Sequence, residues 1–175
     1  MNPADQDQLY TQAQTKHGES MRRLVRGYES DSDRQRDLLQ EMHIELWRSL
    51  KRFDQRCSLR TWVYRVAHNV GADHLTRRRK VSERLVELEA LTADPTAKAG
   101  EARERRREEL AELYALIHRL TPLDRQIILL YLEGETAAEI AEVTGLTSGS
   151  TATRIHRIKK LLNQNFTGVN HEREQ

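Results

Sequence analysis

The chain of 175 residues is poor in the residues that mark several protein classes. Its one cysteine, Cys57, excludes a disulfide within the chain, and a reducing environment is therefore expected. No apolar run approaches the length of a membrane-spanning helix, so we expect no membrane insertion. The N-terminal stretch MNPADQDQLYTQ is polar and acidic, unlike a secretory signal peptide. These absences together predict a cytoplasmic protein.

Proline and aromatic residues are also scarce. Three prolines, with few runs of alternating β-branched residues, predict an all-α protein. Aromatic residues make up 5% of the chain and charged residues 32%, so the hydrophobic cores must be small. The formal net charge is only +2, and this balance alone does not indicate a nucleic-acid partner. The distribution of the charges along the chain is more informative.

Apolar residues recur at helical spacing in two regions, which predicts two small helical domains joined by a flexible linker. We expect an N-terminal unit at 1–80, a linker at 81–109, a C-terminal unit at 110–167 and a tail at 168–175. The linker has no aromatic residue and carries Asp94 and Pro95 at its centre. In the first unit, helices are expected at 34–51 and 58–80, with a loop between them.

The C-terminal unit has the pattern of a helix-turn-helix. The sequence TPLD at 121–124 predicts a helix start, with a threonine cap and proline in the first turn. Thr136 and Glu139 form a capping-box pair that begins a short helix. Gly145 suits the left-handed turn that ends this helix, because glycine adopts that conformation at little cost. The next helix is then placed as a DNA-reading helix.

This last helix, which Thr147 can cap, has two different faces. Thr151, Ile155, Ile158 and Leu162 gather on the side that we expect to be buried. The opposite side and its margins carry cations and short hydrogen-bonding groups, as a major-groove reader requires: Ser150, Ala152, Thr153, Arg154, His156, Arg157 and Lys160. A solvated basic face on an ordinary three-helix bundle is the alternative. The capping signals and the glycine turn favour DNA binding.

The helix expected at 58–80 combines aromatic rings with positive charge. Leu59, Val63, Val66 and Val70 form its predicted buried stripe. Thr61, Tyr64, Arg65 and His68 are predicted to face outward, with Asn69 beside them, Trp62 at the boundary and a basic run at 77–80. Exposed rings can stack on unpaired bases while cations hold the phosphate backbone. For Trp62, a core position between helices is the alternative.

No arrangement of residues indicates catalysis or a metal site. His68 and His74 lie six positions apart and face different directions on one helix. Cys57 with either histidine does not complete a set of ligands at metal-binding spacing. We therefore expect a protein that is not an enzyme and that has no cofactor and no metal.

Two segments resemble a known family. The segment DLLQEMHIELWRSLKRFDQRCSLRTWVYRVAHNVGADHLTRRRK at 37–80 resembles the second conserved region of extracytoplasmic-function sigma factors, group IV of the sigma-70 family of bacterial RNA polymerase. The segment at 110–162 resembles the fourth region of that family, through a spine of Leu120, Asp124, Arg125, Ile127, Leu130, Glu139, Ile140, Ala141, Gly145, Arg154, Arg157 and Lys160. Both stand in family order with a tether between them.

The resemblance implies a sigma factor that directs core polymerase to specific promoters and starts transcription. Its expected partners are the RNA polymerase core enzyme, promoter DNA and an anti-sigma factor. The candidate core-polymerase contacts are Asp37, Gln40, Glu41, Glu45 and Trp47. The candidate −10 contacts are Arg56, Arg60, Thr61, Trp62, Tyr64, Arg65, His68, Asn69, Arg77 and Arg78. The outward face of the last helix would read the −35 element as duplex.

Some positions depart from the family pattern. Thr151 stands where a valine is usual and can bond back to a helix carbonyl, and Ala152 stands where a lysine is common, which puts the −35 preference in doubt. Cys57 lies in the loop expected to hold a flipped base. It either has a redox role or serves only as a small, adaptable loop residue. The alternative function is a sigma mimic or helix-turn-helix regulator that binds an anti-sigma protein or DNA without initiating transcription.

Overall fold

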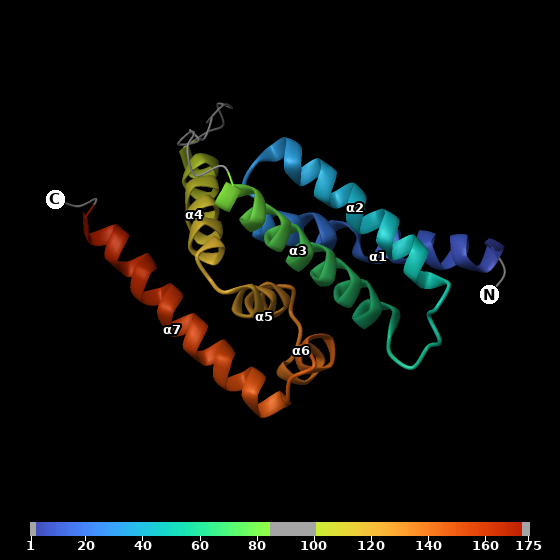
Figure 1. Ribbon diagram of the computed structural model, residues 1–175. Coiled ribbons are helices and arrows are strands. Elements are labelled where there is room, and N and C mark those ends of the chain that lie inside the picture. The colour runs from blue at the N-terminus through green and yellow to red at the C-terminus, as the bar shows by residue number, and fades with distance from the viewer. Residues whose placement is uncertain (1–2, 85–100, 173–175) are drawn as a thin grey trace.

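The computed structural model describes residues 3–84 and 101–172, and its secondary structure there is helical (Figure 1). The helices are α1 (Pro3–Tyr28), α2 (Ser32–Leu50), α3 (Leu59–Arg84), α4 (Glu101–His118), α5 (Pro122–Leu132), α6 (Ala137–Thr144) and α7 (Ser148–Glu172). The all-α fold class is therefore confirmed. Within the described ranges, no helix is both long enough and apolar enough to span a membrane.

Helices α1, α2 and α3 pack against one another in pairs and enclose one hydrophobic core. Its fully buried side chains include Met21 and Leu24 of α1, Met42 and Leu46 of α2, and Val63 of α3. Each of them contributes about 1.5–3 kcal/mol through burial. The helical spacing of apolar residues thus builds the first unit as the sequence predicts.

Glu29, in the turn between α1 and α2, links this turn to α3. Its side chain is fully buried and accepts hydrogen bonds from the amides of Ser30 at 2.9 Å and Asp31 at 3.0 Å. From α3, His74 Nε2 lies 2.8 Å from Oε2, and Arg78 donates to both carboxylate oxygens at 2.9 Å. The end of α3 is thereby fixed to the start of α2.

Helices α4 to α7 form the second unit, and the local signals of the sequence are confirmed there. Thr121 caps α5, and Thr136 with Glu139 makes the capping box of α6. Gly145 ends α6 with φ of 75°, in the left-handed region. Thr147 Oγ1 accepts from the amide of Ser150 at 3.2 Å. Because these signals act over three or four residues, the sequence alone locates the turns.

The helix ends differ from the expected ones in several places. Helix α2 begins at Ser32 because the carboxylate of Asp31 accepts from the amides of Asp33 and Arg34, at 3.1 and 2.9 Å. Helix α3 continues to Arg84 and α4 begins at Glu101, so both reach into the segment expected as linker. The remainder of that segment, residues 85–100, lies outside the described residues.

The two units pack closely against each other, with α6 alongside the first half of α3 (Figure 1). Gly27 of α1 marks the tightest approach, because a Cβ built there would lie 2.4 Å from Cδ2 of Leu129 in α5. A hydrogen atom at this position leaves room for the leucine. His118 at the end of α4 lies with Nε2 2.8 Å from the carbonyl oxygen of Arg26. Both contacts join segments that are far apart in the sequence.

The ionisation of Glu29 should make the stability of the protein sensitive to acid. Burial alone would raise the pKa of Glu29, but hydrogen bonds from His74 and the Asp31 amide, with the charge of Arg78, lower it from 4.5 to about 2. Because the pKa is lower in the folded state, the ionised carboxylate stabilises the fold at pH values above 4.5. This stabilisation is lost as the pH falls toward 2. It amounts to about 3 kcal/mol. Urea unfolding of Glu29→Gln should show a free energy of unfolding that falls less steeply across this window. Glu19→Gln, at an exposed carboxylate of α1, is the control, and equal slopes for all three proteins would contradict the prediction.

Candidate nucleic-acid interface

The outward face of α7 is exposed as the sequence predicts. Thr151, Ile155, Ile158 and Leu162 are buried against α5 and α6. The hydroxyl of Thr151 donates to the carbonyl oxygen of Thr147 at 3.0 Å, so its polar group is satisfied inside the core. On the other side, six of the seven candidate residues are exposed: Ser150, Ala152, Thr153, His156, Arg157 and Lys160. A helix with this face can enter a major groove without rearrangement of the second unit.

Arg154 and Arg157 are both anchored by Asp124, a residue that the sequence analysis did not connect with them. Arg154 donates to Oδ1 of Asp124 at 2.9 Å, and Arg157 donates to Oδ2 at 2.8 Å. Asp124 is 8% exposed, whereas the side chain of Arg157 is 62% exposed. The carboxylate therefore holds two arginines at the edge of the outward face, and each guanidinium keeps further donors for phosphate or base edges.

On α3, the predicted outward orientation of Thr61, Tyr64 and His68 is wrong. They are 7%, 2% and 1% exposed, respectively. The helical period identified which residues share a side, but α3 is enclosed by α1, α2, α5 and α6, so this side is covered as well. Tyr64 packs near His17 of α1, with ring centroids 6.3 Å apart, and beneath the guanidinium of Arg60 at 5.8 Å.

His68 belongs to the core of the first unit. Its Nδ1 lies 2.6 Å from the hydroxyl of Tyr28, which is itself buried. Burial lowers the pKa of His68 to about 3, so the imidazole is neutral at physiological pH. Because its ring is enclosed and uncharged, His68 supports the position of Tyr28 and cannot attract a phosphate.

Trp62 lies partly buried between α3 and α2. Its indole Nε1 donates to Oγ of Ser49 at 3.0 Å, and its ring packs near Phe53 with centroids 5.4 Å apart. These contacts agree with the alternative of a packing position between helices. Trp62 nevertheless keeps an intermediate exposure, and Arg56 in the preceding loop is exposed.

Two arginines in the first half of α3, Arg60 and Arg65, bond to the second unit. Arg60 pairs with Glu135 and also donates to the carbonyl oxygen of Glu133 at 3.3 Å. Arg65 donates to the carbonyl oxygen of Glu142 at 2.8 Å. We call this set, together with an ion pair between Arg23 of α1 and Glu133, the inter-unit clasp. Arg23 donates to both carboxylate oxygens of Glu133 at 2.7 Å.

The clasp brings two carboxylates of the second unit against arginines of the first unit. Glu133 and Glu135 flank Gly134 in the turn between α5 and α6, and the side chains of both are almost fully buried. Burial raises the pKa of Glu135, and the charge of Arg60 opposes this shift. The acidic turn therefore pairs with Arg60, a predicted −10 contact, whereas Arg65 bonds a backbone carbonyl and Arg23 was not among the candidates. The sequence analysis missed it, although the triplet Glu-Gly-Glu before the capping box was the available signal.

The remaining candidates on α3 differ in accessibility. Asn69 is exposed, and Arg77 is exposed while bonding both carboxylate oxygens of Glu41 at 2.7 and 2.8 Å. Arg78 is bound by Glu29. The structure thus pairs Arg77 with Glu41, two residues that were predicted to bind different partners.

The candidate polymerase-binding residues lie along α2. Asp37 and Gln40 are exposed, and Glu45 pairs with Arg48 at 2.8 Å. Trp47 is 38% exposed, and its indole Nε1 donates to Oδ1 of Asp7 at 2.8 Å. Ile44 beside it is 42% exposed. Together they form an acidic and apolar face with an aromatic anchor, which is typical of a protein-binding surface.

The structure is helical and presents two candidate DNA-binding surfaces. One surface, on α7, is open, and the other, on α3, is covered by the clasp. A third surface on α2 suits a protein partner.

Comparison with known families agrees with this arrangement. The family described as sigma-70 region 2 matches residues 14–81, and the family described as sigma-70, region 4 matches residues 110–162. The first match contains α2 and most of α3, and the second contains the helix-turn-helix.

Several curated proteins are similar to the chain. The ECF RNA polymerase sigma factor SigC of Mycobacterium tuberculosis is 33% identical over 138 residues, which cover 77% of this chain and 71% of the relative. The ECF RNA polymerase sigma factor SigX of Bacillus subtilis is 25% identical over 147 residues, which cover 78% and 72%. A probable RNA polymerase sigma factor, RfaY of Xanthomonas campestris, is 29% identical, and the chain spans about a third of its length, 32%.

Two solved structures share the fold. The structure of CnrH in complex with the cytosolic domain of CnrY has a TM-score of 0.67 at 22% identity and covers 91% of this chain and 88% of that one. The sigma factor RpoE in complex with the anti-sigma factor NepR from Bartonella quintana has a TM-score of 0.67 at 18% identity and covers 91% and 97%. At such identities the likeness concerns the fold.

The chain belongs to the sigma-70 family, in its extracytoplasmic-function group. The resemblance found in the sequence is confirmed, and so is the function of an RNA polymerase sigma factor at the level of the family.

The clasp should hold the two units together in solution. Glu133→Gln combined with Glu135→Gln removes both carboxylates while keeping the side-chain shapes. Each ion pair contributes about 0.5–1 kcal/mol, so the equilibrium between packed and separated units should shift about tenfold toward separation. Small-angle X-ray scattering should then report a larger radius of gyration.

The control for this experiment is Glu19→Gln combined with Asp33→Asn, because both carboxylates are exposed and pair only within their own helix. An unchanged radius of gyration in the Glu133 and Glu135 variant would show that the clasp does not hold the units together.

Proposed function

We propose that this protein directs RNA polymerase core enzyme to promoters by reading their −35 and −10 elements with separate units. The observation that carries the proposal is the pair of sigma-70 regions, region 2 at 14–81 and region 4 at 110–162, whose helices α3 and α7 carry the candidate DNA contacts. We further propose that it acts in the cytoplasm and by binding, without catalysing a reaction itself.

The α2 surface is the proposed contact with core polymerase. It combines the carboxylates of Asp37, Glu41 and Glu45 with Gln40 and the partly exposed ring of Trp47. An aromatic anchor surrounded by charge gives affinity through the buried ring and orientation through the rim. The bond from Trp47 to Asp7 and the ammonium of Lys51, 5.4 Å from the ring centroid, fix the indole on this surface.

The −35 element is the proposed ligand of α7. The face holds two guanidiniums, from Arg154 and Arg157, near the exposed side chains of Ser150, Thr153 and His156. Arginine suits bidentate bonding to guanine or phosphate, and the small Ala152 permits apolar contact with a thymine methyl group. Lys160, one turn further along, is placed for backbone phosphate.

The −10 element is the proposed ligand of the covered face of α3 and the loop before it. Arg56 and Asn69 are accessible, but Arg60 and Arg65 must first leave the α5–α6 segment, and Tyr64 is buried beside His17 of α1 and beneath Arg60. Once they are uncovered, the cations bind backbone phosphates, and Tyr64 with Trp62 offers rings to unpaired bases. Promoter binding therefore requires the two units to separate.

An anti-sigma protein is a further proposed partner. The two solved structures described above are complexes, and in one of them the bound protein is named as an anti-sigma factor. A sigma mimic that binds such a protein without promoter activity would not need DNA-reading residues. Arg60, Trp62, Asn69, Arg154 and Arg157 are all present here, which favours promoter recognition.

Run-off transcription tests the proposed function directly. The purified chain would be combined with core polymerase and a library of promoter fragments from its genome. Transcripts that start downstream of a shared pair of elements and need the chain would support the proposal. Stable binding to core polymerase without any transcript would favour the sigma mimic.

Trp47→Ala should weaken the complex with core polymerase by at least about tenfold, because buried aromatic anchors dominate interface energies. Native gel titration or surface plasmon resonance would measure this affinity. Leu110→Ala is a matched control, since Leu110 is 51% exposed and lies on α4 of the other unit. Equal affinity of the Trp47 variant and the wild type would remove this surface from the proposal.

Arg157→Ala should lower affinity for a −35 duplex by about tenfold, because one arginine contact contributes roughly 1–3 kcal/mol. Fluorescence anisotropy at fixed salt measures this loss, and a thermal melt checks that Asp124 tolerates the change. Arg119→Ala, at an exposed arginine in the turn between α4 and α5, should bind like the wild type. A footprint that is unchanged by Arg157→Ala would count against α7 as the reader.

A further inference from the structure

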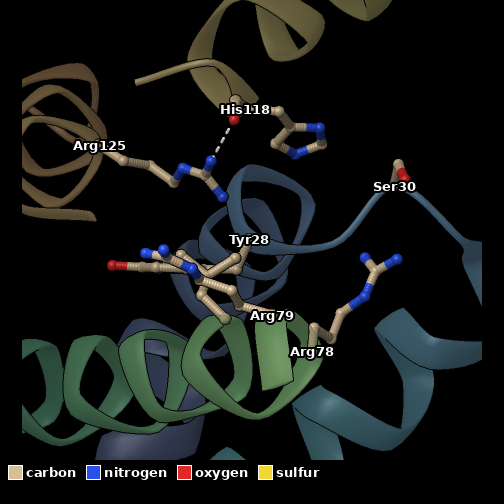
Figure 2. Close-up of a pocket in the computed structure, with 7 residues that line it drawn as sticks. Tyr28, Ser30, Arg78, Arg79, His118 and Arg125 are labelled. Carbon is tan, nitrogen blue, oxygen red and sulfur yellow. Dashed lines mark hydrogen bonds between the residues drawn. The ribbon is translucent and has the colours of Figure 1, made fainter. Parts of the chain in front are cut away.

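A basic cavity of about 310 Å³ lies where the two units meet, away from the clasp. It lies between the end of α1, the end of α3 and the α4–α5 turn. Its lining includes Tyr28, Ser30, Arg78, Arg79, His118 and Arg125. Figure 2 shows the side chains of Arg125, His118 and Arg78 converging on this space from three different segments.

The lining contains three guanidiniums and no acidic residue. The nearby carboxylate of Glu29 balances one of them, because it bonds Arg78 through both of its oxygens. The same carboxylate also bonds to His74 and to the amides of Ser30 and Asp31 in the turn between α1 and α2. This carboxylate does not bond to Arg125, the third guanidinium and the most deeply buried one of the lining.

Arg125 is the residue that most needs an anion. It is 6% exposed, and its Nε is buried without a hydrogen-bond partner among the described residues. In the same part of the structure, its guanidinium bonds only backbone carbonyl oxygens, those of His118 and Leu120. Burial lowers the pKa of Arg125. A buried cation without an opposite charge costs several kcal/mol, and a bound anion would offset that cost.

We propose that this cavity binds a small phosphorylated molecule, with its phosphate held by the guanidiniums of Arg125, Arg79 and Arg78. Guanidinium groups present paired donors that match phosphate oxygens, and the volume is at the lower end of known ligand pockets. The ring of Tyr28 and the side chain of Leu75 supply apolar walls for the rest of the ligand.

A DNA backbone could supply the same phosphate chemistry. The cavity is built from both units in their packed arrangement, and Arg125 reaches it from a buried position. A rigid duplex cannot bring a phosphate into such a space without parting the units. The geometry therefore favours a free ligand over nucleic acid.

The ligand would bridge the two units and so stabilise the arrangement in which the face of α3 is covered. Binding to one arrangement shifts the population toward it in proportion to the differential affinity. The consequence for transcription rests on the proposed function, but binding itself does not, and it can be measured without polymerase or promoter.

Isothermal titration calorimetry of the full chain with sodium pyrophosphate tests the proposal, with total ionic strength held constant by sodium chloride. The expected result is saturable binding at one site. Arg125→Lys should weaken it at least about tenfold, because an ammonium keeps the charge but loses the paired donors. Arg79→Gln should weaken it similarly and serves if Arg125→Lys does not fold.

Arg48→Gln is the control, since Arg48 is 65% exposed and lies on α2 outside the cavity lining. Equal loss of binding in this variant, or no binding beyond that of chloride, would overturn the proposal. A scrambled duplex gives the second arm of the experiment. If Arg125→Lys weakens duplex binding as much as pyrophosphate binding, the site belongs to nucleic acid and the assignment to a small molecule is wrong.

Discussion

The contact between the basic first half of α3 and the acidic turn before α6 determines which surfaces of the molecule are exposed and which are covered. Arg60 meets Glu135, Arg23 meets Glu133, and the peptide backbone of α6 accepts from Arg65. Around these bonds, Tyr64 and Thr61 become buried, and α1 packs onto α5 through Gly27. Because the charges are partly shielded from water, each bond is stronger than it would be on an open surface.

This contact gives the same cations two alternative partners. In the packed form, Arg60 pairs with a carboxylate and Arg65 with a backbone carbonyl, and in the proposed promoter complex, phosphates would replace both partners. The α7 face and the α2 face are not involved, so they remain available in both forms. We therefore expect polymerase to bind α2 of the packed protein first, and the face of α3 to become exposed afterwards. The proposed order of these events follows from which surfaces are open in the packed form.

Structural features that depend on residues close in the sequence could be predicted from it. Features that depend on contacts between distant residues could not. The caps at Thr121 and Thr136, the turn at Gly145 and both faces of α7 were predicted correctly, since each is decided within one or two helical turns. The outward side of α3 was not, because helical periodicity tells which residues share a side but not what covers it. His68 illustrates the difference: in sequence it stands among cations, and in space it lies against Tyr28 of another helix. The anchoring of Arg154 and Arg157 by Asp124 joins residues 30 and 33 positions apart, beyond the reach of local patterns.

The central claim is that the packed arrangement covers α3 until promoter DNA is bound. A distance between spin labels at Gln12→Cys in α1 and Gln164→Cys in α7, in a Cys57→Ser background, tests it most directly, because both positions are exposed and lie on different units. Pulsed electron paramagnetic resonance should give a narrow distribution of distances for the free protein. The mean distance should be longer in the complex with core polymerase and promoter DNA. The same short distance in the promoter complex, or a broad distribution in the free protein, would contradict the account.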